Sequence, residues 1–197
     1  MSDKYKTLIT PADFTFSIWS VIYLLLIVSL VYWFLKRKDA RVGEKFAGIS
    51  LPFWLSCIWN ILWIVFFSYE KIGLSVIFIG LLLLTLLFIL GTTPRDGEKG
   101  SLLLSITFGL YGGWLFVATF VNVGAYVEAI SFEKFGLTNE LFYSILVVLL
   151  LLTAFIVQKI HKNRFFFMPT AWAFFGVFEE LGSFKTYPLL RSIVLLG

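Results

Sequence analysis

Charge is scarce in this chain of 197 residues. Only 14% of the residues are charged while 59% are hydrophobic, whereas about a quarter of the residues of a soluble globular domain are charged. The charges also gather in short clusters between long apolar runs. This pattern excludes a soluble globular domain. The net charge of +4 could suggest a nucleic-acid partner. The clustering of the charges between the apolar runs explains this net charge better.

Cysteine and histidine are almost absent. The single cysteine, Cys57, lies inside an apolar segment, so the chain can form no internal disulfide and no metal site built from cysteines. The single histidine, His161, stands among Lys159, Lys162 and Arg164, which favours a solvated loop residue over a catalytic one. No Ser/His pairing, paired carboxylates or metal-ligand spacing lies within an apolar run, so an enzyme acting inside the membrane has little support.

Apolar runs make up most of the sequence. Six of them approach the roughly 20 residues that a helix needs to cross about 30 Å of hydrocarbon: 14–35, 49–67, 72–91, 102–127, 141–157 and 165–178. A weaker seventh begins near Tyr187, and we expect half a helix, an interfacial segment or a truncated helix there. The first run is too long and too aromatic for a removable signal peptide. The sequence therefore predicts an all-α fold, a polytopic transmembrane bundle of six to seven helices.

The basic residues predict the orientation of this bundle. Short connections make consecutive helices antiparallel neighbours in a single domain. If the connections alternate between the two sides of the membrane, one side holds Lys36, Arg37, Lys38, Arg41, Lys45, Arg95, Lys99, Lys159, Lys162 and Arg164. The other side holds Lys4, Lys6, Lys71, Lys134 and Lys185. Arg191 is left unassigned. The positive-inside rule places the richer side in the cytoplasm and the amino terminus outside.

Two asparagines stand within the apolar runs, Asn60 and Asn122. A buried amide in hydrocarbon loses several kcal/mol unless it finds a hydrogen-bond partner, so both should face the interior of the bundle. Two interpretations remain open for them. Each could join two helices by a hydrogen bond, or each could orient a ligand in a cavity.

Aromatic residues recur at helical spacing beside these amides. Residues three or four positions apart share a helix face, which groups Asn60 with Trp63, Trp19 with Tyr23, and Tyr111 with Trp114, Ala118 and Asn122. Aromatic walls with a few polar groups suit a flat apolar ligand. An interfacial aromatic belt is the alternative, and it explains the residues near the ends of the runs better, namely Tyr32, Trp33, Tyr69 and Tyr126.

Leucine and glycine residues predict two kinds of helix surface. The leucines from Leu81 to Leu84, continuing to Leu90, and those from Leu149 to Leu152 are expected to face lipid. Gly109, Gly112 and Gly113 cluster beside Trp114, where glycine favours the close approach of another helix, or alternatively makes room for a ligand.

Three motifs in this chain resemble one known family. The stretch 110–122 is similar to the final-helix pattern Pro-Tyr-x-x-Trp-x-x-x-Ala-x-x-x-Asn of the tryptophan-rich sensory proteins, also called translocator proteins or peripheral benzodiazepine receptors (the TspO/MBR family). The stretch 60–67 resembles the Asn-x-x-Trp-x-x-Phe-Phe helix of that family. Pro11, followed by Ile18, Trp19 and Tyr23, resembles its proline-rich lead-in and Val-Trp-x-x-x-Tyr helix.

The match has limits and departures. It covers residues 11–127, a four-helix membrane core, and residues 128–197 resemble the additional C-terminal membrane helices of an extended bacterial branch. Leu110 stands where the family has proline, and Phe16 and Ser17 replace Gly-Pro. The family also has a helix ahead of the proline-rich lead-in, and without that helix the pocket is expected to be open on one side.

The resemblance implies a function and a location. It implies a binding protein or sensor in the bacterial cytoplasmic membrane for porphyrin, haem or related tetrapyrroles, with no covalent cofactor, and sterol-like ligands in some members. Sensing, transport or photo-oxidative breakdown would follow binding. The asparagines would orient the ligand, the rings would stack on it and Ala118 would leave space, which gives the expected ligand-binding residues Trp19, Tyr23, Asn60, Trp63, Tyr111, Trp114, Ala118 and Asn122.

A second hypothesis needs no small molecule. The glycine and leucine faces would suit an accessory membrane subunit that packs against a membrane partner protein or against a second copy of itself. Both hypotheses place the chain in a lipid bilayer, and neither involves nucleic acid.

Overall fold

Most of the chain that the structure describes is helical. The computed structural model describes residues 5–92, 101–130, 136–182 and 187–197. Within these ranges the elements are the 3-10 helix η2 (Asp13–Ser17) and the helices α1 (Ile18–Lys36), α2 (Ala40–Ser68), α3 (Ile72–Thr92), α4 (Ser101–Ala129), α5 (Asn139–His161), α6 (Met168–Gly182) and α7 (Pro188–Leu196). The predicted all-α bundle of six to seven helices is confirmed.

Five of the described helices, α1 to α5, are long and apolar enough to cross a membrane. Helix α6 has 15 residues and α7 has nine, so at a rise of about 1.5 Å per residue they extend about 22 Å and 14 Å. Both fall short of the roughly 30 Å of hydrocarbon in a bilayer. The run 165–178 therefore forms a helix that is too short to span, and the last run forms the expected half helix.

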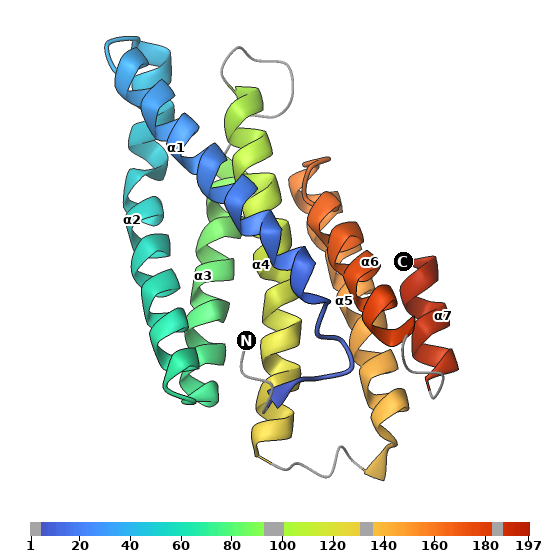
Figure 1. Cartoon of the computed structure of the whole chain (residues 1–197). Helices are drawn as coiled ribbons and strands as arrows, with labels where there is room; N and C mark the ends of the chain where they lie inside the picture. Colours follow the sequence, from blue (N-terminus) through green and yellow to red (C-terminus); the bar gives the residue numbers. More distant parts are fainter. Residues whose placement is uncertain (1–4, 93–100, 131–135, 183–186) are drawn as a thin grey trace.

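Successive helices run in opposite directions, as the short connections predicted (Figure 1). The α1–α2 and α5–α6 connections, the end of α3 and the start of α4 lie at one end of the bundle, which we call the basic end. Its described basic residues are Lys36, Arg37, Lys38, Lys159, Lys162 and Arg164. Lys4, Arg95, Lys99, Lys134 and Lys185 lie outside the described residues. The cytoplasmic assignment of the basic end stays a prediction.

His161 corrects one expectation. It is the last residue of α5, and Lys162 follows it in the left-handed conformation, with φ of 54°. The ring is partly buried against α3, where a Cβ placed on Gly91 would lie 3.3 Å from the His161 Cε1 atom. The expectation of a solvated loop residue is wrong, because α5 continues through the basic cluster and packs on the end of α3.

Helix α4 is the centre of the bundle. In its most apolar stretch 67% of the residues are buried, against at most 33% in the other spanning helices. It contacts α1, α3, α5 and α6.

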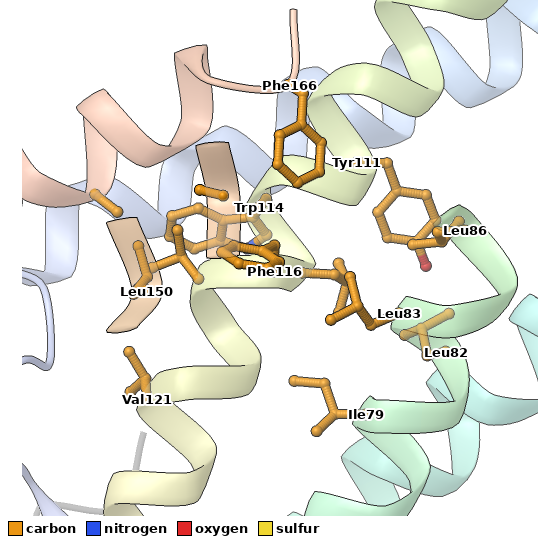
Figure 2. Packing of buried hydrophobic residues seen from close by; sticks show 14 of the residues in the cluster. Ile79, Leu82, Leu83, Leu86, Tyr111, Trp114, Phe116, Val121, Leu150 and Phe166 are labelled. Carbon is orange, nitrogen blue, oxygen red and sulfur yellow. The ribbon is translucent and has the colours of Figure 1, made fainter. Parts of the chain in front are cut away.

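The position of α4 corrects the expectation that the leucines of α3 face lipid. Four of them, Leu82, Leu83, Leu86 and Leu90, are buried. Figure 2 shows Leu82, Leu83 and Leu86 on the side of α3 that faces α4.

The remaining leucines divide in the same way. Leu84 is 65% exposed and belongs to the lipid-facing side of α3. Leu149 and Leu152 are also exposed, whereas Leu150 between them is buried. Each leucine run therefore has one face toward lipid and one toward a neighbouring helix.

Glycines on α4 receive the connection between α5 and α6. A Cβ on Gly113 would collide with the backbone carbonyl of Phe166, and a Cβ on Gly109 would collide with the side chain of Asn163. The Asn163 amide nitrogen donates a 3.0 Å hydrogen bond to the Ser105 carbonyl. The glycine cluster therefore serves close packing, the first of the two roles considered for it.

Helices α3 and α4 are joined by a buried hydrogen bond. The Ser75 hydroxyl donates to the Asn122 Oδ1 atom at 2.7 Å, and both side chains are almost fully buried. Asn122 therefore faces the interior of the bundle, and its oxygen has the interhelical role. This bond fixes the position of the α4 face that carries Trp114 and Ala118.

The glycine packing predicts an asymmetry between two alanine substitutions. Gly113→Ala should lower stability by about 1–3 kcal/mol, because the new methyl group forces α4 away from the Phe166 carbonyl. Gly80→Ala is the matched control, since nothing lies within 4 Å of a Cβ there and alanine favours the helix. Thermal unfolding in detergent measures both variants. Equal unfolding midpoints would contradict the close packing of α4.

The Ser75–Asn122 bond predicts a smaller effect. Ser75→Ala should destabilise the bundle by about 0.5–2 kcal/mol, the range of interhelical hydrogen bonds in membrane proteins. Thr85→Ala serves as the control, because the Thr85 hydroxyl bonds to the Leu81 carbonyl within its own helix and is exposed. Unfolding in increasing concentrations of a denaturing detergent measures the stability of both variants. Equal stabilities would show that the Ser75–Asn122 bond does not stabilise the packing of α3 on α4.

Candidate functional site

A small cavity lies where the N-terminal segment (residues 5–17), α1, α2 and α4 meet. Its volume is about 40 Å³. Its walls are formed by Pro11, Phe16, Trp19, Trp63, Trp114, Val117, Ala118, Val121 and Asn122. Five of the eight expected ligand-binding residues are in this set, so the structure brings all three sequence motifs to one place.

Trp19 is the aromatic centre of the cavity wall. Its ring centroid lies 6.2 Å from that of Trp63 on α2 and 6.5 Å from that of Trp114 on α4, with an interplanar angle of 87° to Trp114. It stacks on Tyr23 at 5.3 Å and meets Tyr111 edge-on at 6.0 Å. Offset and edge-to-face pairs at such distances are the favoured arrangements of aromatic rings.

Three expected residues lie outside the cavity wall. Tyr23 is 43% exposed and covers the far side of the Trp19 ring. Tyr111 is buried in the hydrophobic core, where Figure 2 shows its ring beside Leu86. Asn60 is partly buried, and its Oδ1 atom is enclosed without a hydrogen-bond partner among the described residues. Asn60 thus turns a polar atom inward, as expected, but not toward this cavity.

The polar atoms around the cavity are mainly hydrogen-bond donors. The ring N–H groups of Trp63 and Trp114 are both buried, and the described residues provide no acceptor for either. Asn122 uses its oxygen for Ser75, which leaves its amide nitrogen as the group that can donate. A buried donor without a partner costs about 1–3 kcal/mol. A bound molecule with acceptor oxygen or nitrogen atoms would remove that cost.

The N-terminal segment covers this cavity and is attached to α6. The Ala12 backbone N–H donates to the Gly176 carbonyl at 3.2 Å, and the Trp172 ring N–H donates to the Thr15 carbonyl at 2.9 Å. Phe16 meets the Trp114 ring edge-on at 5.7 Å. The N-terminal segment and α6 thus cover this side of the cavity, and the expectation of a pocket open on one side stays a prediction.

An ion pair adds to this attachment. The Lys6 ammonium lies 2.8 Å from the Glu180 carboxylate, and both side chains are partly exposed. Ion pairs of this kind contribute at most about 1 kcal/mol. Packing holds the segment as well, because Thr15 is fully buried and Phe14 packs edge-on against Trp172 of α6. The ion pair is therefore one weak contribution beside these packed contacts.

Sequence reasoning missed several residues of the wall. Val117 and Val121 stand three and seven positions after Trp114, so helical spacing alone could have placed them on its face. Phe16 gave no signal, because it replaces the glycine of the family pattern. Trp172, which holds the N-terminal segment over the cavity, lies beyond residues 11–127, which the motifs cover.

Metal chemistry finds no support in the described ranges. No group of three or more His, Cys, Asp or Glu side chains able to hold a metal ion is present among these residues. The candidate site, as the structure describes it, is an aromatic cavity with polar donors.

Comparison with known proteins gave one match. The family model described as TSPO-like protein matches residues 1–196, and so extends across the C-terminal helices as well as the stretch 11–127. Searches among curated proteins and among solved structures found no match. Because the family model covers nearly the whole chain, this multi-pass membrane protein belongs to the TspO/MBR family of TSPO-like proteins.

Proposed function

We propose that the protein binds a flat hydrophobic molecule with hydrogen-bond acceptors, such as a porphyrin or a haem-related tetrapyrrole, in the cavity around Trp19. The observation that carries the proposal is the pair of buried, unpartnered ring N–H groups of Trp63 and Trp114 in a mainly apolar wall. Rings from three helices provide the stacking surface. Sensing or transport of the molecule would follow from its binding.

The size of the cavity decides how binding would proceed. About 40 Å³ is far below the roughly 300–1,000 Å³ of pockets that hold drug-sized ligands. The ligand must therefore displace part of the wall. The N-terminal segment is the part best suited to move, because Pro11 and Phe16 belong to a short segment outside the long helices, whereas the other walls belong to α1, α2 and α4.

The same small volume favours a second candidate function. If the segment does not move, Trp19, Trp63 and Trp114 form a packed aromatic core. The chain would then act as an accessory membrane subunit that binds no small molecule. The two candidates predict opposite results in a binding titration.

Porphyrin titration should show saturable quenching of tryptophan fluorescence in the detergent-purified protein. Trp114→Phe keeps the aromatic bulk and removes the ring N–H, so the Kd should rise about tenfold, as expected for the loss of one good hydrogen bond. Asn122→Ala should weaken binding as well. Trp59→Phe is the matched control, because Trp59 stacks on Phe78 and does not line the cavity.

The controls separate the two candidate functions. An unchanged Kd in Trp59→Phe together with weaker binding in Trp114→Phe supports the site. Quenching that is absent, or linear in porphyrin concentration and equal in all variants, favours the accessory subunit. A Trp63→Ala, Trp114→Ala double variant that folds and keeps full affinity for porphyrin would contradict the assignment of these residues to the binding site.

The N-terminal segment gives a kinetic prediction. Glu180→Gln removes the ion pair with Lys6, so the cover should open more often and the association rate of porphyrin should rise by up to about fivefold. Glu179→Gln makes the same charge change at the exposed neighbouring position and should leave the rate unchanged. Stopped-flow fluorescence measures the rates. Identical rates in both variants would contradict a cover that is held by the ion pair.

A further inference from the structure

A second cavity lies toward the basic end of the bundle. It has a volume of about 310 Å³ and lies between α1, α2 and α4. Its surface is almost entirely apolar, with Leu26, Leu30, Trp33, Phe53 and Phe108 among the residues around it. The volume reaches the lower range of pockets that bind small molecules. This cavity shares no lining residue with the one around Trp19.

Its two hydroxyl groups already have hydrogen-bond partners. The Ser29 hydroxyl lies 2.9 Å from the hydroxyl of Thr107, and the Ser50 hydroxyl donates to the Ala47 carbonyl at 3.0 Å. The cavity therefore has no buried polar group that requires a ligand partner, in contrast to the unpartnered donors around Trp114. An occupant of this cavity needs only hydrocarbon.

The cavity is open toward the side of the bundle that faces lipid. Trp33 on α1 and Trp54 on α2 are 37% and 67% exposed, whereas Ile49, Leu104 and Phe108 are at most 5% exposed. The exposed residues form a rim, and the buried residues form the floor. A hydrocarbon chain can therefore enter sideways from the bilayer between α1 and α2.

Basic residues stand beside this opening. Leu26, Leu30, Trp33 and Arg37 follow each other at spacings of four, three and four, so Arg37 lies on the cavity face of α1, one turn beyond Trp33. Lys36 and Lys38 are exposed beside it. The segment 36–45 holds five basic residues and two acidic ones, Asp39 and Glu44. An anionic group at the membrane surface is attracted to such a segment.

We propose that this cavity binds one acyl chain of an anionic membrane phospholipid, with the phosphate held beside Lys36 and Arg37. The apolar floor accepts the chain, the open rim admits it from the bilayer, and the basic segment selects the charge of the headgroup. A zwitterionic lipid has the same chains without the net charge, and a free fatty acid has the charge without the bilayer anchor. Neither matches both parts of the site. The inference does not depend on tetrapyrrole binding.

Native mass spectrometry of the intact, detergent-purified protein tests the proposal with phosphatidylglycerol and phosphatidylcholine of identical chains. The wild type should retain one phosphatidylglycerol in preference to phosphatidylcholine. Leu30→Trp fills the cavity and should abolish this binding, whereas Leu24→Trp, at an exposed position of α1 away from the cavity, should not. Arg37→Gln should reduce the preference about fivefold, the contribution of one basic residue near a membrane surface.

Lys159→Gln is the matched control for Arg37→Gln. Lys159 lies 4.6 Å above the Phe155 ring, much as Arg37 lies 4.5 Å above the Phe34 ring, but it is on α5 and away from the cavity. The preference for phosphatidylglycerol should survive in this variant. Equal retention of both lipids by the wild type, equal losses in Arg37→Gln and Lys159→Gln, or displacement of the phospholipid by an equal concentration of laurate would each overturn the proposal.

Cys57 provides a second, local measurement. It is the single cysteine of the chain and lines this cavity. Phosphatidylglycerol should therefore slow its alkylation by N-ethylmaleimide in the wild type at least fivefold, and much less in Arg37→Gln. Retention of the lipid without protection of Cys57 would place the lipid elsewhere and refute the site. This readout does not need Leu30→Trp to fold.

Discussion

The burial of α4 is the constraint on which the rest of the structure depends. A helix in the middle of a membrane bundle gains little from hydrophobicity alone, since lipid tails are as apolar as its neighbours, and its position must be fixed by shape and by polar bonds. Helix α4 meets this requirement differently on each side. Glycines admit the α5–α6 connection on one side, Asn122 bonds to Ser75 of α3 on another, and Trp114 faces α1 and the N-terminal segment.

The two cavities show how one set of helices can offer two kinds of chemistry. Both are bounded by α1, α2 and α4, at opposite ends of these helices. Around Trp19 the walls include donors without acceptors, so the ligand proposed there is a molecule that carries acceptors. At the basic end every hydroxyl in the wall has a partner, so the ligand proposed there is a hydrocarbon chain. The difference lies in unsatisfied hydrogen bonds rather than in aromatic content, which is high in both.

The sequence predicted the helices and one face of α4 well, and the contacts among helices poorly. Hydropathy located all the helices, and spacing placed Trp114, Ala118 and Asn122 on one face because helical periodicity is a local property. The buried leucines of α3 were misassigned, since a leucine suits lipid and a neighbouring helix equally. The attachment of Trp172 to the N-terminal segment was out of reach, because it joins residues 157 positions apart and leaves no periodic signal.

The attachment of the N-terminal segment to α6 also determines when, during synthesis of the chain, the aromatic cavity can acquire its last contacts. Thr15 and Trp172 are 157 residues apart, and ribosomes add about 5–20 residues per second. For about 8–30 s, therefore, the segment has been made but its partner has not. Trp114 is made 58 residues before Trp172, so for about 3–12 s of this interval the face of Trp19 and Trp114 exists without the α6 contacts that hold the N-terminal segment. The aromatic cavity is therefore among the last features of the molecule to acquire all its contacts.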